Sequence, residues 1–421
     1  MVLAGRIVVS GNSAALTLCD LTQSYAARGG GVKTFLREKR RFILDRTDAS
    51  HCLIVPGAED RVTRDGRAIT IEIRSPQVPG SPNYRLLLRT NAVLEALELA
   101  RPDLVECQDA YNLPWTALYH RRRRPETAVV AGYHTDFPTV YVEKYLRPRA
   151  GAYVARQVRR LAYRYAGALY KQCDGFYTLT QMAAEHFTAL GLRHADILTL
   201  GADTALFHRA RRDEELRAKI GVAPSAPLLI YAGRIDREKK ARVVVDAFRK
   251  LPASWGAGLV MLGDGKERAA LTAECAGLNA HFPGFVDDRE TLAAYLASSD
   301  IYVSAMEDET FGISVIEAQA AGLPVVGVRA GAMIDRVPAS LGRLGPCGDS
   351  GAMAANIAAV WMDRLSEMGA RARTHALENF SWEKTFEKLL FQIYPAALAR
   401  RSGKTVAPVF EPAETPRARA G

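Results

Sequence analysis

Short apolar runs alternate along this chain with longer stretches whose apolar residues recur at the spacing of a helix face. Strands separated by helices form βαβ units, and such units build parallel sheets, so we expect an α/β protein. The expected strands cover residues 6–9, 51–55, 103–107, 127–133, 227–232, 259–262, 281–285, 301–304 and 324–328. The expected helices cover residues 32–44, 84–100, 151–171, 241–251, 266–276, 289–298, 312–321 and 382–397.

The chain length of 421 residues favours two domains of about 200 residues over one core. We expect a Rossmann-like domain over residues 1–200 and a second one over residues 201–381. The helix within residues 382–400 is expected to pack back toward the first domain. The stretch 401–421 is rich in Pro, Ala, Arg and Glu and lacks a periodic apolar face, which predicts a disordered tail.

Composition narrows the partners and the compartment. The net charge of +10 and the pI of about 9.3 favour anionic partners, such as nucleotide phosphates, an acidic membrane surface or nucleic acid. The six cysteines form no CxxC pair, no His cluster has metal-ligand spacing, and dispersed thiols suit the cytoplasm. We find no export signal and no run of 18 apolar residues, so membrane contact would be peripheral.

A pair of cations follows the expected strand at 227–232. Gly233 ends this strand, and the loop after it carries Arg234 and Lys239. Ligands of open α/β sheets bind outside the carboxyl ends of the strands. Two cations at such a place suit a diphosphate, because a departing nucleoside diphosphate accumulates negative charge. The alternative is a solvated basic loop.

Two carboxylates eight positions apart come next along the second half. Glu309 precedes an expected helix, and Glu317 lies inside it among apolar residues. A carboxylate on such a helix needs a partner, and vicinal sugar hydroxyls would serve. The backbone amides at Phe311, Gly312 and Ile313 open the helix, and helix N-termini favour anions. The alternative is a helix cap with a solvated glutamate.

These segments together resemble the glycosyltransferase family 4 type of GT-B enzyme, whose fold is α/β with two facing Rossmann-like domains and parallel sheets. The family pattern G-R-x4-K, G-D-G, G-F-V and E-x7-E appears here, in that order, within residues 227–394. The matching residues are Gly233, Arg234 and Lys239, then Gly263, Asp264 and Gly265, then Gly284, Phe285 and Val286, and finally Glu309 and Glu317.

The resemblance implies a role for each matched position. Arg234 and Lys239 would hold the donor diphosphate, without a bound metal or other cofactor. Glu317 would bind the ribose and Glu309 the donor sugar of a UDP- or GDP-linked hexose. The G-D-G run would also contribute Asp264 to donor binding, and the backbone near Phe285 and Val286 would touch the base. Lys240 departs from the family, which usually has Gly there.

The first half adds further candidates. Gly30 and Gly31 open a helix after the first strand region, as in the glycine-rich loop of the family, and glycine lets a backbone approach a ligand closely. His134 follows the expected strand at 127–133, and Asp136 and Tyr141 lie just beyond it. This His-Thr-Asp-Phe-Pro run resembles the branch of the family that glycosylates lipids or lipid-linked glycans. His134 is a catalytic candidate, with Asp136, Tyr141 and Asp109 as acceptor-binding candidates.

We therefore expect a retaining hexosyltransferase that uses a nucleotide sugar and a lipid or lipid-linked acceptor at the membrane surface. The expected helix at 151–171 has an apolar stripe and a basic face, which either packs on a core or contacts anionic lipid. One alternative is a soluble or polysaccharide acceptor, and another is a nucleotide-sugar epimerase. A nucleic-acid binder, suggested by the arginine run at 121–124, lacks any accompanying motif, so we expect no nucleic-acid partner.

Overall fold

The computed structural model describes residues 15–25, 30–79, 81–193, 195–363 and 365–402. The chain divides into two compact units. One unit comprises residues 1–199 together with 383–421, and the other comprises residues 200–382. The predicted strand at 6–9 lies outside the described residues, and so does the tail from residue 403 onward.

The first unit contains an eight-stranded sheet with the order β10-β9-β8-β7-β1-β2-β4-β3. Its strands are parallel except for β3, which runs antiparallel to β4. The order reverses between β1 and β7, which are hydrogen-bonded neighbours, as in a doubly wound fold. The strands are β1 (Thr17–Leu21), β2 (Ser50–Gly57), β3 (Arg61–Asp65), β4 (Ala68–Arg74), β7 (Leu104–Cys107), β8 (Ala128–Tyr133), β9 (Gly175–Thr178) and β10 (Asp196–Ile197). A separate small hairpin joins β5 (Gln77–Val78) to β6 (Ser81–Arg85).

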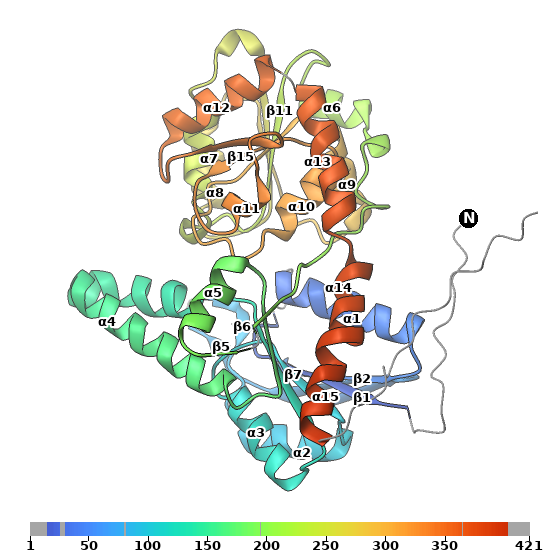
Figure 1. The fold of residues 1–421 in the computed structure, drawn as a ribbon. Helices are drawn as coiled ribbons and strands as arrows, with labels where there is room; N and C mark the ends of the chain where they lie inside the picture. Colours follow the sequence, from blue (N-terminus) through green and yellow to red (C-terminus); the bar gives the residue numbers. More distant parts are fainter. Residues whose placement is uncertain (1–14, 26–29, 80, 194, 364, 403–421) are drawn as a thin grey trace, which may run out of the picture. The chain divides into compact units, whose positions relative to one another are not determined.

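Helices connect the strands of the first unit. They are α1 (Gly31–Arg46), α2 (Thr90–Ala100), α3 (Leu113–Arg123), the π-helix η1 (Pro138–Glu143), α4 (Lys144–Tyr170) and α5 (Gln181–Ala189). Helix α4 breaks at Gly151, where φ is 80° and ψ is 163°, and its two limbs are visible in Figure 1. The predicted helix at 84–100 begins too early, because Tyr84 and Arg85 belong to strand β6 and the helix starts only at Thr90.

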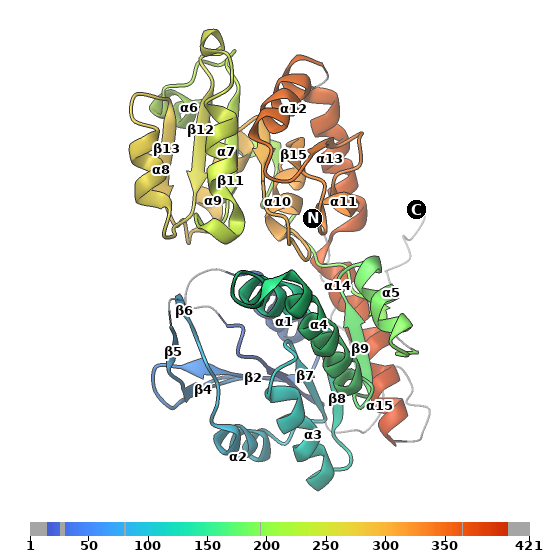
Figure 2. The ribbon, with the colours of Figure 1, turned by 90° about the vertical axis from the view of Figure 1, so that its left-hand side faces the viewer.

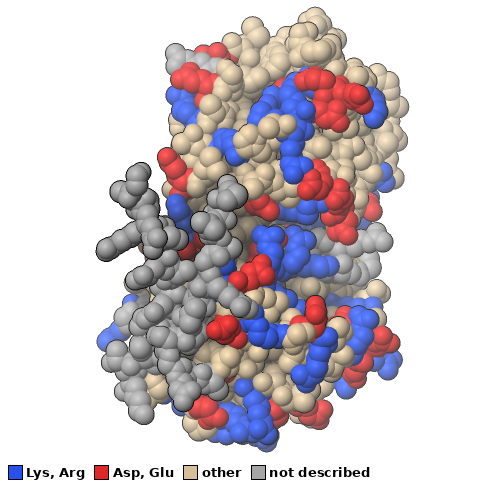
Figure 3. All heavy atoms as spheres, turned by 90° about the vertical axis from the view of Figure 1, so that its right-hand side faces the viewer, with Lys and Arg blue, Asp and Glu red and all other residues tan. Residues whose placement is uncertain are grey.

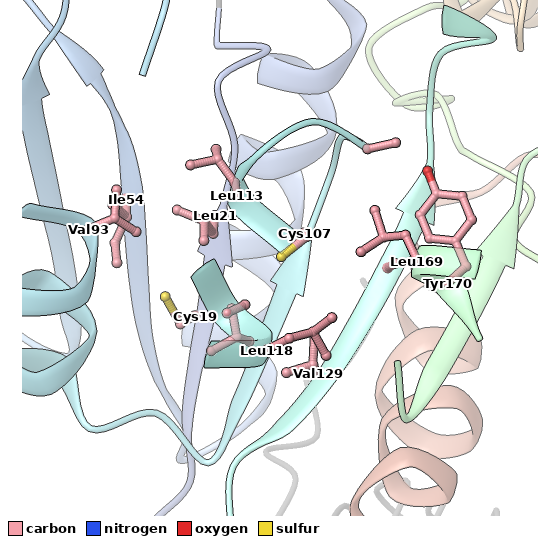
Figure 4. Packing of buried hydrophobic residues seen from close by; sticks show 14 of the residues in the cluster. Cys19, Leu21, Ile54, Val93, Cys107, Leu113, Leu118, Val129, Leu169 and Tyr170 are labelled. Atoms are coloured by element: carbon pink, nitrogen blue, oxygen red, sulfur yellow. The ribbon is translucent and has the colours of Figure 1, made fainter. Parts of the chain in front are cut away.

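The core of the first unit lies under the central strands. Cys19, Ile54, Val105 and Val129 come from four neighbouring strands and are all buried. Figure 4 shows Leu169 and Tyr170, from the end of α4, among the residues of this cluster. The apolar character of both strand faces fits a parallel sheet covered by helices.

The C-terminal segment returns to the first unit. It forms α14 (Trp382–Lys388), the π-helix η5 (Leu389–Ile393) and α15 (Tyr394–Ser402), and α15 contacts β8 and β9. The prediction of disorder from residue 401 is wrong for its first two residues, which continue α15. Arg401 donates a hydrogen bond to the carbonyl of Pro125 at 2.5 Å, so the helix is held to the loop before β8.

The second unit contains a six-stranded parallel sheet with the order β13-β12-β11-β14-β15-β16. Numbered within the unit, this is the 3-2-1-4-5-6 order of the Rossmann fold. The strands are β11 (Leu228–Ala232), β12 (Gly258–Leu262), β13 (Ala280–Gly284), β14 (Ile301–Val303), β15 (Val325–Val328) and β16 (Gly342–Gly345). Helices pack against this sheet in Figure 2, and the order reverses between β11 and β14.

The helices of the second unit are η2 (Arg209–Arg211), α6 (Glu214–Ile220), η3 (Arg237–Lys239), α7 (Ala241–Phe248), η4 (Ala253–Trp255), α8 (Arg268–Glu274), α9 (Arg289–Ser298), α10 (Ile313–Ala320), α11 (Met333–Arg336), α12 (Ser350–Met362) and α13 (Leu365–Asn379). The sequence predicted α7, α8, α9 and α10 of this unit and did not predict its other helices. The predicted α/β class with two Rossmann-like units is confirmed, and every strand predicted in this half is present within one or two residues of its expected bounds.

Candidate functional site

The loop after β11 occupies the switch point of the second sheet. Gly233 and Arg234 follow β11 directly, and the loop that contains Glu309 follows the neighbouring strand β14. Gly263, at the end of β12, lies so close that a Cβ there would be 1.8 Å from the carbonyl oxygen of Gly233. Its φ of 139° also excludes most other residues. The backbone at Gly263, in the G-D-G run, is therefore in close contact with the backbone at Gly233, where the basic loop begins.

The side chain of Arg234 is held by two carboxylates of its own loop. Its Nη1 donates to Asp236 at 2.6 Å, and its Nη2 donates to Glu238 at 2.9 Å. The Arg234 side chain nevertheless keeps 41% of its surface exposed. A guanidinium that is oriented but still accessible is suited to bind phosphate oxygens.

The second cation of the motif lies beside the first acid of the E-x7-E pair. The Nζ of Lys239 is 3.6 Å from Oε2 of Glu309 and donates to the sulfur of Met306 at 2.6 Å. The other oxygen of Glu309 accepts a hydrogen bond from the amide of Gly312 at 3.1 Å. The structure therefore brings Lys239, Glu309 and the start of α10 together.

Lys240, which replaces the usual glycine of the family, adopts a left-handed conformation with φ 55°. Its Nζ lies 3.6 Å from Oε1 of Glu307, in the loop that also carries Glu309. This conformation costs a residue with a Cβ about 1 kcal/mol. Two lysines in succession therefore pair with two glutamates of the loop after β14.

Glu317 is buried on α10 and pairs with a cation from another helix. The Nη2 of Arg289 donates to its Oε1 at 2.7 Å, and the guanidinium of Arg289 lies 4.7 Å from the centroid of the Phe207 ring. Sequence reasoning missed Arg289, although a buried carboxylate requires a partner of this kind. Phe285 is 39% exposed, whereas Phe311 is buried beneath the guanidinium of Arg336.

The remaining donor candidates occupy two places in the second unit. Asp264 is exposed, and its backbone carbonyl accepts a hydrogen bond from the amide of Ile235. Val286 is half-buried two residues after the end of β13, and Ile313 begins α10. Gly312 precedes that helix with φ 84°, which favours glycine.

In the first unit, Gly30 is the N-cap of α1 and Gly31 its first residue. The φ of Gly30 is 101°, a value that favours glycine and explains its presence there. Gly30 has no side chain, so the N-cap position itself supplies no side-chain hydrogen bond to the first turn of α1. This arrangement agrees with the expected glycine-rich loop.

A small pocket lies at the carboxyl ends of β1, β7 and β8. It is partly open to solvent and is lined by Gln108, Asp109, Gly132, His134 and Thr135, among others. Burial lowers the pKa of His134 to about 3, so the imidazole is neutral at physiological pH. Burial raises the pKa of Asp109 to about 6, although hydrogen bonds from Gln23 and Thr22 oppose that shift.

The two carboxylate oxygens of Asp109 differ in their hydrogen bonds. Its Oδ2 accepts from the amide of Gln23 at 2.9 Å and from the hydroxyl of Thr22 at 3.2 Å. Its Oδ1 is buried and has no hydrogen-bond partner among the residues that the structure describes. A buried, unpartnered carboxylate oxygen in a pocket is a feature that a ligand hydroxyl would satisfy.

The other two acceptor candidates differ in their surroundings. Asp136 accepts hydrogen bonds from the hydroxyls of Tyr133 and Tyr163, at 2.8 and 2.7 Å, so its Oδ1 is engaged by the protein. Tyr141 lies in η1 and is 55% exposed. Asp136 therefore shapes the loop after His134, while Tyr141 belongs to the surface.

A buried network of charged and polar groups underlies the pocket, and sequence reasoning did not single it out. Its members are Asp20 on β1, Lys39 on α1, His51 on β2, Glu106 on β7, Gln108, Tyr177 on β9 and Tyr394 on α15. The hydroxyl of Tyr177 lies 2.9 Å from Nε2 of His134 and so joins the network to the pocket. The sequence did contain a sign of this network, since Asp20 and Glu106 each lie inside an apolar strand and acidic residues are rarely buried without partners.

The two Rossmann-like units and the site at the second switch point define a class of enzyme, and comparison with known proteins gives the family. The family model described as Glycosyltransferase Family 4 matches residues 29–205, and the one described as Glycosyl transferases group 1 matches residues 212–376. The chain is 30% identical over 349 residues to a GDP-mannose-dependent alpha-mannosyltransferase of Mycobacterium tuberculosis, which covers 82% of this chain and 87% of the relative. The chain belongs to glycosyltransferase family 4 and is a glycosyltransferase of the GT-B fold, as the sequence motifs predicted.

A second relative covers more of the chain. The GDP-mannose-dependent alpha-(1-6)-phosphatidylinositol dimannoside mannosyltransferase of Mycobacterium tuberculosis is 29% identical over 401 residues, which are 93% of this chain and 99% of the relative. Among solved structures, the sucrose-phosphate synthase of Thermosynechococcus elongatus matches with a TM-score of 0.72 at 18% identity. That match covers 89% of this chain and 97% of the synthase, and it supports the fold.

The described part of the chain contains neither a membrane-spanning helix nor a cluster of metal-ligating side chains. None of its helices is both long and apolar enough to cross a membrane. Within the same residues, we find no group of three or more His, Cys, Asp or Glu placed to hold a metal ion.

Proposed function

We propose that this chain transfers mannose, with retention of configuration, from GDP-mannose to a phosphatidylinositol-linked mannoside. The observation that carries the proposal is the pairing of Lys239 with Glu309 at the switch point of the second sheet, next to the accessible guanidinium of Arg234. The two relatives with GDP-mannose in their names support the choice of base and sugar. The name of one of them supports the lipid acceptor.

The donor half of the reaction uses the second unit. Arg234 and Lys239 would bind the diphosphate and stabilise the charge that builds up on the leaving group, a role that preorganised donors perform well in a site shielded from water. Glu309 would bind the mannose, and Glu317 the ribose hydroxyls. Glu309 currently engages Lys239 and the amide of Gly312, so donor binding would exchange the Lys239 contact for a phosphate.

The acceptor half uses the pocket of the first unit. His134 is neutral because burial lowers its pKa to about 3, so it can exchange hydrogen bonds with sugar hydroxyls but does not carry a positive charge. The unpartnered Oδ1 of Asp109 would accept a hydrogen bond from a hydroxyl of the incoming mannoside. Its pKa of about 6 keeps it ionised at neutral pH.

We further propose that the enzyme is cytoplasmic and reaches its lipid acceptor as a peripheral protein at the inner face of the membrane. The apolar stripe predicted on α4 does not all face the core, because Val154, Leu161 and Tyr165 are 44%, 59% and 40% exposed while Leu169 is buried. The flanking aromatic residues Tyr145 and Tyr153 are also exposed. Exposed apolar groups beside arginines are typical of helices that lie in a lipid interface.

The charge on the exposed side of α4 supports an anionic surface as the partner. Arg156, Arg160 and Arg164 are exposed, whereas Arg159 pairs with Glu143 at 2.9 Å and is only partly accessible. Each basic residue near an anionic leaflet contributes about 1 kcal/mol, so the three exposed arginines would increase binding by about a hundredfold. On the face drawn in Figure 3, by contrast, basic and acidic residues are interspersed, which gives little support to a nucleic-acid partner.

The donor and the acceptor are tested together with purified enzyme. GDP-mannose, UDP-glucose and UDP-galactose are each incubated with phosphatidylinositol mannosides in vesicles, with a soluble mannose oligosaccharide, or without acceptor. Of the three sugar nucleotides, we expect only GDP-mannose to give a glycolipid product. Transfer only to the soluble acceptor would replace the lipid assignment, and conversion of the sugar nucleotide without acceptor would indicate an epimerase. A nucleotide present at 100 times its Kd should also stabilise the protein by about 2.7 kcal/mol.

Membrane contact is tested by sedimentation with vesicles that contain anionic lipid. Binding should require that lipid, weaken with salt, and fall about a hundredfold when Arg156, Arg160 and Arg164 become Gln. The control variant changes three exposed arginines of β3 and β4 in the same unit, namely Arg61, Arg64 and Arg74. Equal losses in both variants would mean that net charge, not the α4 surface, drives the binding.

A further inference from the structure

Glu106 lies at the centre of the buried network and accepts four hydrogen bonds. Its Oε1 accepts hydrogen bonds from the hydroxyl of Tyr177 at 2.7 Å and from the amide nitrogen of Gln108 at 2.5 Å. Its Oε2 accepts one from the hydroxyl of Tyr394 at 2.5 Å. The ammonium of Lys39 lies 3.2 Å from the same Oε2. A carboxylate offers about four acceptor positions, so all of those on Glu106 are occupied and Glu106 donates no proton to a neighbour.

The phenol of Tyr177 has only one hydrogen, and it goes to Glu106 at 2.7 Å because the other acceptor, Oε1 of Gln108, is 3.4 Å away. Burial, and then the charge of Glu106, raise the pKa of Tyr177 well above its usual value, so the phenol stays protonated. The phenol oxygen can therefore only accept from the ring nitrogen of His134 that lies 2.9 Å away. That nitrogen, Nε2, must carry the imidazole proton, and Nδ1 is left with a lone pair.

We propose that Tyr177 and Glu106 are positioning residues that fix His134 in its Nε2–H tautomer and so present Nδ1 as a hydrogen-bond acceptor for a substrate hydroxyl. This inference rests on the proposed role of His134 in the reaction. A histidine held in one tautomer and one orientation does not have to reorganise as the transition state forms. Tyr177 touches no reacting group itself and acts through His134.

The backbone beneath this contact is shaped to allow it. Gly132 pairs with Tyr177 across β8 and β9. A Cβ at Gly132 would lie 2.4 Å from the Tyr177 hydroxyl and 2.8 Å from Nε2 of His134. Only glycine leaves room for this hydrogen bond at its present place. The ring of Phe35, with its centroid 5.0 Å from that of His134, supports the imidazole from another side.

A second histidine of the network is fixed in the same manner. His51 accepts at Nδ1 from the Nε of Arg40, at 2.9 Å, and its Nε2 lies 2.7 Å from Asp20. Because an arginine can only donate, His51 must be the Nε2–H tautomer. The charges of the network also balance, since Asp20 and Glu106 are matched by Lys39 and Arg40, which explains how two carboxylates are tolerated in the sheet.

The experiment compares two phenol deletions. Tyr177→Phe and Tyr394→Phe each remove one fully buried hydroxyl that donates to Glu106, and only the first also breaks the contact with His134. The tautomer is read from the 15N chemical shifts of His134 in protein labelled at histidine, with His134→Gln to assign the signal. Activity is measured as kcat and KM with the donor and acceptor that the wild type uses.

We expect the wild type and Tyr394→Phe to show a single Nε2–H form, and Tyr177→Phe to show a mixture of tautomers. Tyr177→Phe should lower kcat about ten- to a hundredfold, the range known for loss of a partner that orients a metal-ligating histidine, with little change in KM because Tyr177 touches no substrate. Tyr394→Phe should keep kcat within a few-fold of the wild type. A wild-type Nδ1–H signal, or equal kcat and equal spectra in the two variants, would overturn the inference.

Failure of the proposed function gives a different result. If His134→Gln keeps full activity, the role of His134 in the reaction is wrong. The nitrogen spectra then still test whether Tyr177 fixes its tautomer. If His134→Gln is inactive while Tyr177→Phe behaves like Tyr394→Phe, the role of His134 stands and the positioning by Tyr177 is wrong.

Discussion

Replacement of Arg234 by alanine should have a small effect on the stability of the fold and a large effect on kcat. The two ion pairs of Arg234 lie at the surface, with 41% of its side chain exposed, and exposed pairs contribute about 0–1 kcal/mol to stability. A loss of that size lowers Tm by up to about 4 °C in a domain of this length. If Arg234 stabilises the departing diphosphate, its removal should lower kcat about a hundred- to a thousandfold, or about 2.7–4 kcal/mol.

Arg242 offers a matched control in the same unit. Its side chain is 42% exposed, and it forms two hydrogen bonds with Glu274, at 2.6 and 2.9 Å. It lies on α7, beyond the loop that follows β11. Both alanine variants should show small shifts in Tm by calorimetry, and only Arg234→Ala should lose turnover measured as release of nucleoside diphosphate. Near-wild-type kcat in Arg234→Ala, or an equal loss in Arg242→Ala, would refute the assignment of the diphosphate to this loop.

Three further predictions follow from the same structure. Glu317→Ala should weaken binding of the free nucleoside diphosphate and of the intact donor alike, whereas Glu309→Ala should weaken only the intact donor; calorimetry that finds equal losses in both variants would contradict this division. Burial raises the pKa of Asp109 from about 3.9 in the unfolded chain to about 6, so the native state holds the extra proton between these values and stability falls as pH rises through that range, by at most about 3 kcal/mol. Asp109→Asn should remove this dependence from urea unfolding measured between pH 4 and 7, and an unchanged slope would show that Asp109 is not its source. Gly132→Ala should destabilise the protein by about 1–3 kcal/mol and lower kcat, because the new methyl group displaces the hydroxyl of Tyr177; a variant with wild-type stability and kcat would show that the sheet accommodates it.

The proposed donor residues could be singled out from the sequence because they form two clusters, each of which is local along the chain. Arg234 and Lys239 belong to one loop, and Glu309 and Glu317 to one loop and helix. Strand ends are visible in the sequence where an apolar run meets Gly, so the placement of Arg234 after β11 followed from a local pattern. The partners of these residues could not be predicted in this way, because Arg289, for example, is 28 positions from Glu317 and lies on a different helix.

Some predictions failed where local patterns competed with pairing elsewhere in the chain. The apolar residues near Tyr84 suggested an early start for the helix that begins at Thr90, but β6 pairs with β5 instead. The stripe on α4 was correctly predicted as helical, yet its spacing could not show which side meets the core. Leu169 is buried and Leu161 exposed, because the break at Gly151 and the packing of the helix end set its rotation.

The sequence by itself determined the α/β class, the two Rossmann-like units, the family and the donor motif, because each of these is encoded in short-range periodicity or in a short ordered pattern. Only the tertiary structure decided what surrounds His134. Tyr177 is 43 positions away from it, and Glu106 and Tyr394 are 288 positions apart, yet hydrogen bonds join these pairs. Strand order brings these groups to the interior of one sheet, and the low polarity there makes each hydrogen bond decisive for the state of its neighbour. A proton position inside such a network is a property of the folded chain, and no local pattern of residues encodes it.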